Sequence, residues 1–443
     1  MTFGEAVEWI LSFGNSGVVP HQEAPAERRQ LVPLRALLQR LGDPQRGRGT
    51  VHITGSKGKG STALMIAELL RTAGKRTGLQ TSPHLHTIRE RMRVDGELIT
   101  EDEFAALATA VRPHAEAVGT FGGRLTTFDL LTTLGFVFFR EHEAGWQVVE
   151  VGLGGTLDST NVLDEKELCV FTPIGLEHTA VLADTVAKIA ADKTGILRTG
   201  TRAVMAPQRE SAAEVIRAAC ADKSVPLEVV AAVCQLSRGR CSLDEQEFRL
   251  RTPRSEYRLK LPLLGRFQTE NAATAVLGVE QLADHGVELT PQQAATALAA
   301  ARWPGRVEVL KRAPLIVVDG AHTADSARRL VQTIREDLAH RALYLVVGTS
   351  SDKDPAEFAI PFVALNPVVI ATASRHPRSA SAGGVGQAFQ DQGLMVRLAP
   401  DVESAMDMAR SEAGSGDLIL ATGSLFVAAE ARAAVLGLLP VAG

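Results

Sequence analysis

The sequence predicts an α/β protein with two domains, the first of which carries a small antiparallel β insertion. Short apolar segments, each followed by glycine or polar residues, alternate with segments of helical periodicity, as in parallel α/β folds. A glycine-rich turn joins the first of these strands to a helix. At about 150 residues per domain, a length of 443 residues fits two large domains or three ordinary ones.

The first part of the chain is predicted to form the larger domain. Strands are expected at residues 50–53, 77–80, 147–151 and 169–172. A helix is expected over 62–71, where apolar residues recur with helical spacing and Gly74 follows as a stop. Between about 227 and 264 apolar residues such as Phe248 and Tyr257 alternate with polar ones, which predicts an antiparallel meander.

The rest of the chain is predicted to complete this domain and to form a second one. Helices are expected over 271–283 and 291–301, the latter capped by Thr290. Residues 302–305, Arg-Trp-Pro-Gly, interrupt the pattern as a linker. Further strands are expected at 314–318, 342–347, 367–371 and 417–421, with a helix over 324–338. The predicted domains are 1–302 and 303–443.

Composition and charge exclude several classes of protein. The 47 basic and 51 acidic residues give a net charge of −4, which does not favour nucleic-acid binding. The four cysteines form no CxxC pair, so neither a disulfide framework nor a structural zinc site is expected. The start MTFGEAVEWI lacks the features of a signal peptide, and no apolar run approaches about 18 residues. We expect a cytoplasmic protein that acts on small molecules, without a membrane or nucleic-acid partner.

The segment HITGSKGKGST predicts a phosphate-binding loop. Gly55, Gly58 and Gly60 let the backbone wrap closely around an anion, and Lys59 adds a positive charge. Ser61 lies at the start of the following helix, whose free N–H groups face the same point. The loop is a variant of the P-loop, because a glycine separates the lysine from the serine.

Four further residues could serve a phosphate site. Glu150 ends an apolar strand ahead of a glycine turn, where a carboxylate can hold Mg²⁺ beside a nucleotide. Ser82 and His178 follow other strand ends, and Lys193 lies on a helix expected to start near residue 184. Each also has an ordinary alternative: a solvated acid for Glu150, a turn for Ser82, a surface or core histidine for His178, and a solvated helix face for Lys193.

In the second domain, Asp319 and His322 follow the strand expected at 314–318. An acid in this position can accept hydrogen bonds from ribose hydroxyls. The alternative is a cluster that caps the following helix.

Taken together, these segments resemble the folylpolyglutamate synthase and dihydrofolate synthase family of the Mur ligase superfamily. The resemblance covers nearly the whole chain and rests on motifs that occur in order. They are GSKGKGST, TSPHLHTIRERMRVDG, TTFDLLTTLGF, EVGLGGTLDSTN, IGLEHTAVLADTVAKIAADKTGIL, LLGRFQTENAATA, WPGRVEVL, VVDGAHTADSA, SDKD, HPRSA and TGSLF. It implies a P-loop-containing, Mur-ligase-like ATPase domain followed by a Rossmann-like α/β domain.

The resemblance also implies roles for individual residues. The glycine loop with Lys59 would hold ATP phosphates, and Asn271, Arg306 and Asp319 would contact ATP from both sides of an interdomain cleft. Ser82, Glu150, His178 and a carbamylated Lys193 would bind Mg²⁺ at two sites, with Lys59, Glu150, His178 and Lys193 as the catalytic set. The substrate would be touched by Ser82, Thr126, Thr127, Phe128, Asp129, Leu157, Asp158, Ser159 and His322.

The implied reaction is ATP-dependent addition of L-glutamate to a reduced folate through an acyl phosphate, by a monomeric enzyme. Thr127, Asp129 and Thr156 depart from the residues usual in the family, so dihydropteroate stays open as a second acceptor. Two rivals are a Mur-type ligase for another carboxylate and a nucleotide-binding protein without catalysis. The first is disfavoured because only 54 residues precede Gly55. The second is disfavoured by the presence of Glu150, His178, Lys193 and Asp319 together.

Overall fold

The larger sheet has eight strands in the order β4-β3-β2-β5-β1-β6-β7-β8. The computed structural model describes residues 1–14, 31–119, 124–176 and 183–438. The strands are β1 (Gly49–Thr54), β2 (Thr77–Gln80), β3 (Met92–Val94), β4 (Glu97–Leu98), β5 (Trp146–Glu150), β6 (Leu168–Phe171), β7 (Arg202–Met205) and β8 (Leu227–Val229). The six strands β2-β5-β1-β6-β7-β8 run parallel to their neighbours in the sheet. Strands β3 and β4 are added antiparallel at one edge.

Helices cover both faces of this sheet, which explains why its central strands are apolar on both sides. One face packs against α4 (Lys59–Thr72), α10 (Arg266–Glu280) and α11 (Pro291–Ala300). The other packs against α6 (Thr127–Glu141), α7 (Val186–Lys193) and α8 (Glu210–Asp222). Outside α6 lie α1 (Phe3–Leu11), α3 (Val32–Arg40) and α5 (Glu101–Gly119). Buried parallel strands need this double cover, because neither face can meet water.

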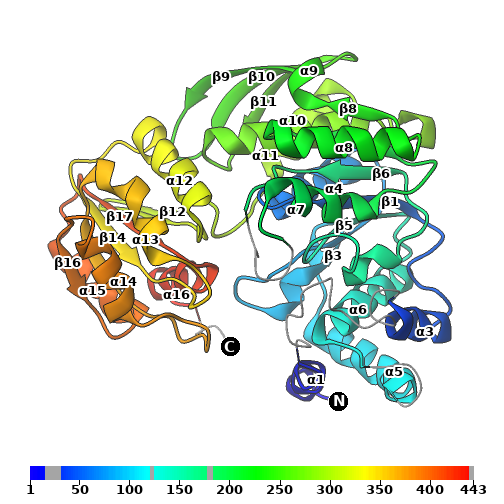
Figure 1. The fold of residues 1–443 in the computed structure, drawn as a ribbon, viewed down its shortest axis with the longest axis horizontal. Coiled ribbons are helices and arrows are strands. Elements are labelled where there is room, and N and C mark those ends of the chain that lie inside the picture. The colour runs from blue at the N-terminus through cyan, green and yellow to red at the C-terminus, as the bar shows by residue number, and fades with distance from the viewer. Residues whose placement is uncertain (15–30, 120–123, 177–182, 439–443) are drawn as a thin grey trace.

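A three-stranded antiparallel sheet bridges the two lobes (Figure 1). It consists of β9 (Gln235–Cys241), β10 (Gln246–Arg251) and β11 (Glu256–Leu261). One face packs on α10 and α11, as the alternating pattern predicts. At its other end Arg238 pairs with Asp337 at 2.9 Å and Glu336 at 3.0 Å in the smaller lobe.

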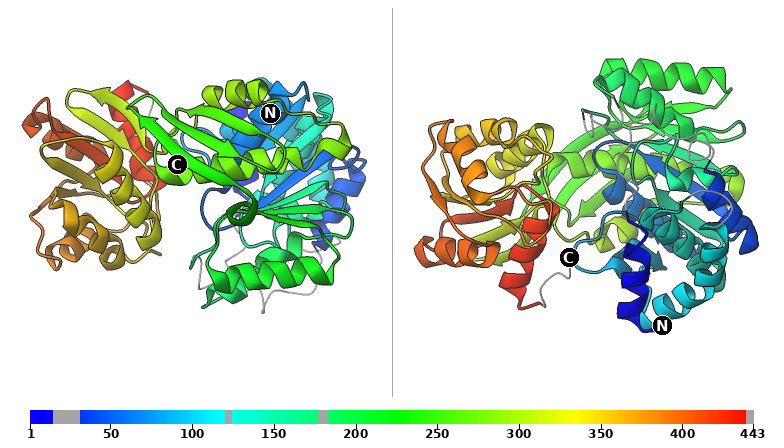
Figure 2. Two further views of the ribbon diagram at one scale, coloured as in Figure 1. Left: turned by 90° about the horizontal axis from the view of Figure 1, so that it is seen from above. Right: turned by 60° about the horizontal axis from the view of Figure 1, so that its bottom comes forward.

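The smaller lobe contains a six-stranded sheet in the order β12-β13-β17-β14-β15-β16. Its strands are β12 (Glu308–Arg312), β13 (Leu315–Val318), β14 (Leu343–Val347), β15 (Val368–Ala371), β16 (Val396–Leu398) and β17 (Leu418–Thr422). Its helices are α12 (Ala324–Asp337), α13 (Pro355–Ala359), α14 (Ala382–Gln390), α15 (Val402–Glu412) and α16 (Leu425–Leu436). The views in Figure 2 show this lobe standing apart from the larger one.

The α/β class with an antiparallel insertion is confirmed, whereas several expected boundaries were wrong. Helix α4 begins at Lys59 rather than 62, because Gly58 already takes the N-cap position. Helix α10 spans Arg266–Glu280 instead of 271–283. The meander begins at β9, since residues 227–229 form the edge strand of the larger sheet. The division of the chain at 302/303 stays a prediction.

Among the helices of the described ranges, none combines the length and the apolar character that a membrane span requires.

The three-stranded sheet is held to α10 by a buried polar contact that offers a stability test. The Tyr257 hydroxyl donates to Glu280 Oε1 at 2.6 Å, and burial raises the pKa of Glu280. Tyr257→Phe should lower the free energy of unfolding by about 1–2 kcal/mol, because a buried carboxylate oxygen loses a donor. Tyr344→Phe is the control, since its hydroxyl makes only a 3.5 Å contact at the surface. Urea denaturation measures both, and equal effects would contradict the assignment.

Candidate active site

A cleft of about 2740 Å³ lies between the two lobes and is lined by residues from both. On the side of the larger lobe it is bounded by the segments that follow β1, β2 and β5. On the opposite side it is bounded by the segment after β13 and by residues around Ser424. The carboxyl ends of parallel strands are where ligands bind in sheets of this kind.

The glycine loop packs so closely that a Cβ at three of its positions would crowd a neighbouring side chain. Gly58 has a φ of 84°, and a Cβ there would lie 2.5 Å from Asn271 Oδ1. A Cβ at Gly60 would lie 3.2 Å from the Trp303 ring. A Cβ at Gly55 would lie 1.9 Å from Thr172 Oγ1. The loop therefore presents bare backbone at the N-terminus of α4, which is the geometry that phosphate binding requires.

Glu150 is the last residue of β5 and is 5% exposed. Its Oε2 accepts a hydrogen bond from the Ser82 amide at 2.9 Å, which joins the segments after β2 and β5. Burial raises the pKa of Glu150, while the charge of Lys59, the Ser82 N–H and the charges of Arg306 and Arg91 act in the opposite direction. The alternative of a solvated acid is excluded for Glu150.

Lys193 is the last residue of α7 and is 3% exposed, so it does not belong to a solvated helix face. Its Nζ donates to the Gly55 carbonyl at 2.9 Å, next to the phosphate loop. The glycine turn after β5 packs directly on it, because a Cβ at Gly155 would lie 2.7 Å from Lys193 Cα. His178, which was expected beside these residues, lies outside the described residues.

The predicted substrate segments form one wall of the cleft around the start of α6. Thr126, Thr127, Phe128, Leu157, Asp158 and Ser159 line it. Asp129 does not line the cleft. It is fully buried, and its carboxylate accepts from the Thr126 amide at 2.9 Å and from the Ser159 hydroxyl at 2.6 Å. Asp129 therefore caps α6 and ties the two segments together.

The smaller lobe contributes the opposite wall. Asp319 is buried, and its carboxylate accepts from the Val307 amide at 2.9 Å and the Ala321 amide at 2.8 Å. Burial raises its pKa, against the charge of Arg306. The cap of α12 is Thr323, not Asp319. His322 Nε2 lies 3.4 Å from Lys57 Nζ, so the two lobes meet across the cleft.

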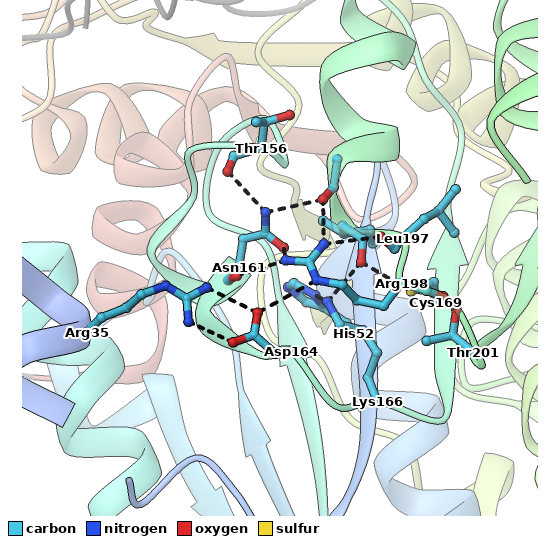
Figure 3. A network of polar contacts seen from close by, with 12 residues as sticks. Arg35, His52, Thr156, Asn161, Asp164, Lys166, Cys169, Leu197, Arg198 and Thr201 are labelled. Carbon is cyan, nitrogen blue, oxygen red and sulfur yellow. Dashed lines mark hydrogen bonds and ion pairs between the residues drawn. The ribbon is translucent and has the colours of Figure 1, made fainter. Parts of the chain in front are cut away.

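A buried polar network behind the cleft was missed by the sequence analysis (Figure 3). Lys166 Nζ lies 2.9 Å from both His52 Nδ1 and the Ile196 carbonyl. His52 Nε2 in turn lies 2.8 Å from Thr160 Oγ1, which donates to Asp158 on the cleft wall. The network thus links the turn after Lys193 to the segment 157–159. No local pattern predicts it, because its members come from four separate segments.

Arg91 and His84 also line the cleft without having been singled out, although both lie in the motif TSPHLHTIRERMRVDG. Arg91 Nε donates to His84 Nδ1 at 2.9 Å. In the sequence these residues read as part of a run of mixed charge, and only the fold shows which of them face inward.

Gly58 gives a direct test of the phosphate loop. Gly58→Ala should weaken ATP binding by about 10-fold or more, because the new methyl group displaces Asn271 and strains the loop. Gly74→Ala is the matched control: its φ is 79°, yet a Cβ there meets nothing within 4 Å. Both variants carry the backbone strain, so only the contact at the loop differs. Calorimetric titration with a non-hydrolysable ATP analogue compares them, and equal affinities would refute the assignment.

The buried network predicts a specific pH dependence of stability. Burial lowers the pKa of Lys166 to about 7 from an ordinary 10.5, with Cys169, Arg198, Asp164 and Lys223 also acting on it. Between these values the unfolded chain binds a proton that the folded chain does not, so stability rises with pH. The free energy of unfolding of wild type relative to Lys166→Met should therefore increase from about pH 7 upward. The exposed Lys188→Met is the control, and a flat difference for Lys166→Met would contradict the prediction.

Two domain families of the Mur ligases match this chain. The Mur ligase middle domain matches residues 53–279, and the glutamate ligase domain of Mur ligases matches residues 305–425. A Mycobacterium tuberculosis folylpolyglutamate synthase, solved in complex with ADP and AMPPCP, superposes with a TM-score of 0.85 at 30% identity. That match covers 93% of this chain and 96% of that one.

Two curated relatives match almost the whole chain. A dihydrofolate synthase/folylpolyglutamate synthase of Bacillus subtilis is 30% identical over 434 residues, covering 97% of this chain and 98% of the relative. A probable bifunctional folylpolyglutamate synthase/dihydropteroate synthase of Haloferax volcanii is 35% identical over 441 residues, covering 98% of this chain but 50% of the relative, so the chain spans half of that protein. The chain therefore belongs to the folylpolyglutamate synthase/dihydrofolate synthase family of the Mur ligase superfamily.

Proposed function

We propose that this chain is an ATP-dependent ligase that joins L-glutamate to the carboxylate of a reduced folate through an acyl-phosphate intermediate. The observation that carries the proposal is the meeting of the glycine loop and Glu150 with Arg306 and Asp319 in one cleft between two lobes. The names of the Bacillus subtilis and Haloferax volcanii relatives support the same chemistry.

The reaction needs two steps because a carboxylate is a poor electrophile. A carboxylate oxygen of the acceptor first attacks the γ-phosphorus of ATP, the bond to ADP breaks, and an acyl phosphate forms. The amine of glutamate then attacks the acyl carbon, phosphate leaves, and the surplus proton of the amine passes to water. Lys59 and the loop N–H groups stabilise the negative charge on the phosphoryl oxygens, which is the main contribution of a phosphoryl-transfer site.

The two lobes are proposed to protect the acyl phosphate from water. Trp303 of the linker lies against Gly60 of the loop, and Lys57 meets His322 across the cleft. Closure of the lobes over bound substrates would exclude water until the amine has arrived. In this arrangement Asn271, Arg306 and Asp319 contact ATP. The segments 126–128 and 157–159, with Ser82 and His322, contact the acceptor.

Mg²⁺ fits the larger-lobe side of the cleft. Glu150 and Ser82 offer oxygen ligands, which Mg²⁺ prefers, and a cation would offset the cost of burying the Glu150 carboxylate. Within the described ranges no three His, Cys, Asp or Glu side chains form a metal cluster, so nucleotide phosphates and water would supply the other ligands. Bound Mg²⁺ neutralises charge on the transferring phosphoryl group. Carbamylation of Lys193, whose Nζ now donates to the Gly55 carbonyl, would turn it into an oxygen ligand, with His178 as a further ligand.

The remaining sequence-based expectations belong to the same proposal. The enzyme is expected to be a monomer in the cytoplasm, with domains 1–302 and 303–443 and without a nucleic-acid partner. The net charge of −4 supports the last point. Dihydropteroate is the second acceptor to be tested.

Transfer of labelled glutamate to tetrahydrofolate and to dihydropteroate tests the function. Wild type with ATP and Mg²⁺ should label tetrahydrofolate, and labelling of both acceptors would identify a bifunctional enzyme. Glu150→Gln should lower kcat/KM by about 100-fold or more, because the site loses the charged oxygen ligand proposed to hold Mg²⁺ beside the phosphoryl group. Glu141→Gln, at an exposed carboxylate, is the control and should match wild type. Labelling of neither acceptor by wild type that still binds ATP would overturn the folate assignment.

A further inference from the structure

Arg91 occupies a place in the cleft that the proposed mechanism does not yet use. It ends a 3₁₀ helix (Ile88–Arg91) and directly precedes β3. Because β3 runs antiparallel to β2, its first residues lie beside the carboxyl ends of the parallel strands β2, β5 and β1. Following the strand order β3-β2-β5-β1, this end of the sheet carries Arg91, then Ser82, then Glu150 and then the phosphate loop.

The guanidinium of Arg91 is held in place by His84. Its Nε donates to His84 Nδ1 at 2.9 Å. Because an arginine nitrogen can only donate, Nδ1 accepts this bond through its lone pair. The two Nη atoms of Arg91 are not used in this contact.

Within the described residues Arg91 forms no ion pair, although the charges of Glu150 and Glu90 act on it from farther away. Glu90, its neighbour in sequence, instead accepts from the backbone N–H groups of Leu85, His86 and Thr87 at 2.7–3.1 Å. Glu150 Oε2 accepts from the Ser82 amide, and its charge acts on Arg91 without a direct contact. Burial lowers the pKa of Arg91 to about 10, which still leaves it charged at neutral pH.

The two terminal nitrogens of Arg91 have no acceptor among the described residues. They are not among the fully buried polar atoms without a partner, and Arg91 lines the cleft. A partly desolvated guanidinium whose terminal N–H groups have no acceptor is suited to a planar anion with two oxygens. It binds such an anion through two parallel hydrogen bonds.

We propose that Arg91 binds the reacting carboxylate of the acceptor and holds its oxygens while the acyl phosphate forms. The position favours this anion over the ATP phosphates, which have Lys59 and the loop amides on the far side of β5. The acceptor wall at residues 126–128 and 157–159 borders the same cleft. This assignment rests on the proposed ligase function, since it names the group that positions the nucleophilic carboxylate.

Three variants test the assignment, with glutamate transfer to tetrahydrofolate as the assay. Arg91→Ala removes the guanidinium, Arg91→Lys keeps the positive charge without the planar set of donors, and Arg89→Ala is the matched control. Arg89 lies on the same short helix, but it donates to the Ile99 carbonyl and does not line the cleft. Each variant is also titrated with a non-hydrolysable ATP analogue, and its thermal unfolding is recorded to identify misfolding.

Arg91→Ala should lose about 100-fold or more in kcat/KM for the acceptor while its affinity for the ATP analogue stays within about threefold of wild type. Arg91→Lys should recover only part of the loss, because an ammonium cannot bind both oxygens. Guanidinium chloride, well below its denaturing range, should restore activity to a folded Arg91→Ala but not to Glu150→Gln. A structural role alone would not produce this rescue.

The outcomes separate this inference from the proposed function. If wild type and Arg89→Ala transfer glutamate and Arg91→Ala does so equally well, Arg91 has no role and the ligase function stands. If Arg91→Ala loses ATP affinity in proportion to activity, the residue binds the nucleotide and the assignment to the acceptor is overturned. If wild type itself transfers no glutamate, the proposed function fails first.

Discussion

The arrangement of the cleft depends on the absence of Cβ atoms in the phosphate loop. A Cβ at Gly55, Gly58 or Gly60 would meet Thr172 just after β6, Asn271 of α10 or Trp303 of the linker between the lobes. A side chain at any of these positions would displace its neighbour. The loop is therefore tightly packed against its neighbours as well as suited to phosphate. Its contact with Trp303 also positions the linker that leads to the second lobe.

The electrostatics of the cleft follow from this close packing. Glu150 and Asp319 are buried on opposite walls, and burial raises the pKa of both. Lys59, Arg306 and Arg91 lie near enough to act on one or both carboxyl groups, yet in the described residues Arg91 forms no ion pair. Charges that are held apart in a desolvated cleft remain available to a ligand, whereas charges already paired with each other would not be.

The sequence predicted the elements whose signal is local. Fully buried strands such as β13 and β17 appear as apolar runs, and Thr290 marks the start of α11 through its cap. The edge strands β12 and β16 were missed, because they are only partly buried and lack such a run. Most of the candidate site lay in recognisable motifs. Arg91 and the pair of His52 with Lys166 did not stand out, since their contacts join segments that are distant in sequence.

The three-stranded sheet packs on α10 and α11 of the larger lobe and reaches the smaller lobe at one end. Arg238 pairs with Asp337, which is almost fully buried, so the lobes are fastened at that end of the cleft. Arg209 with Asp325, and Arg432 with His86, also join the two lobes. Rotation of the smaller lobe about the three-stranded sheet would therefore have to break these polar contacts and form them again, which sets a free-energy cost on each opening of the cleft.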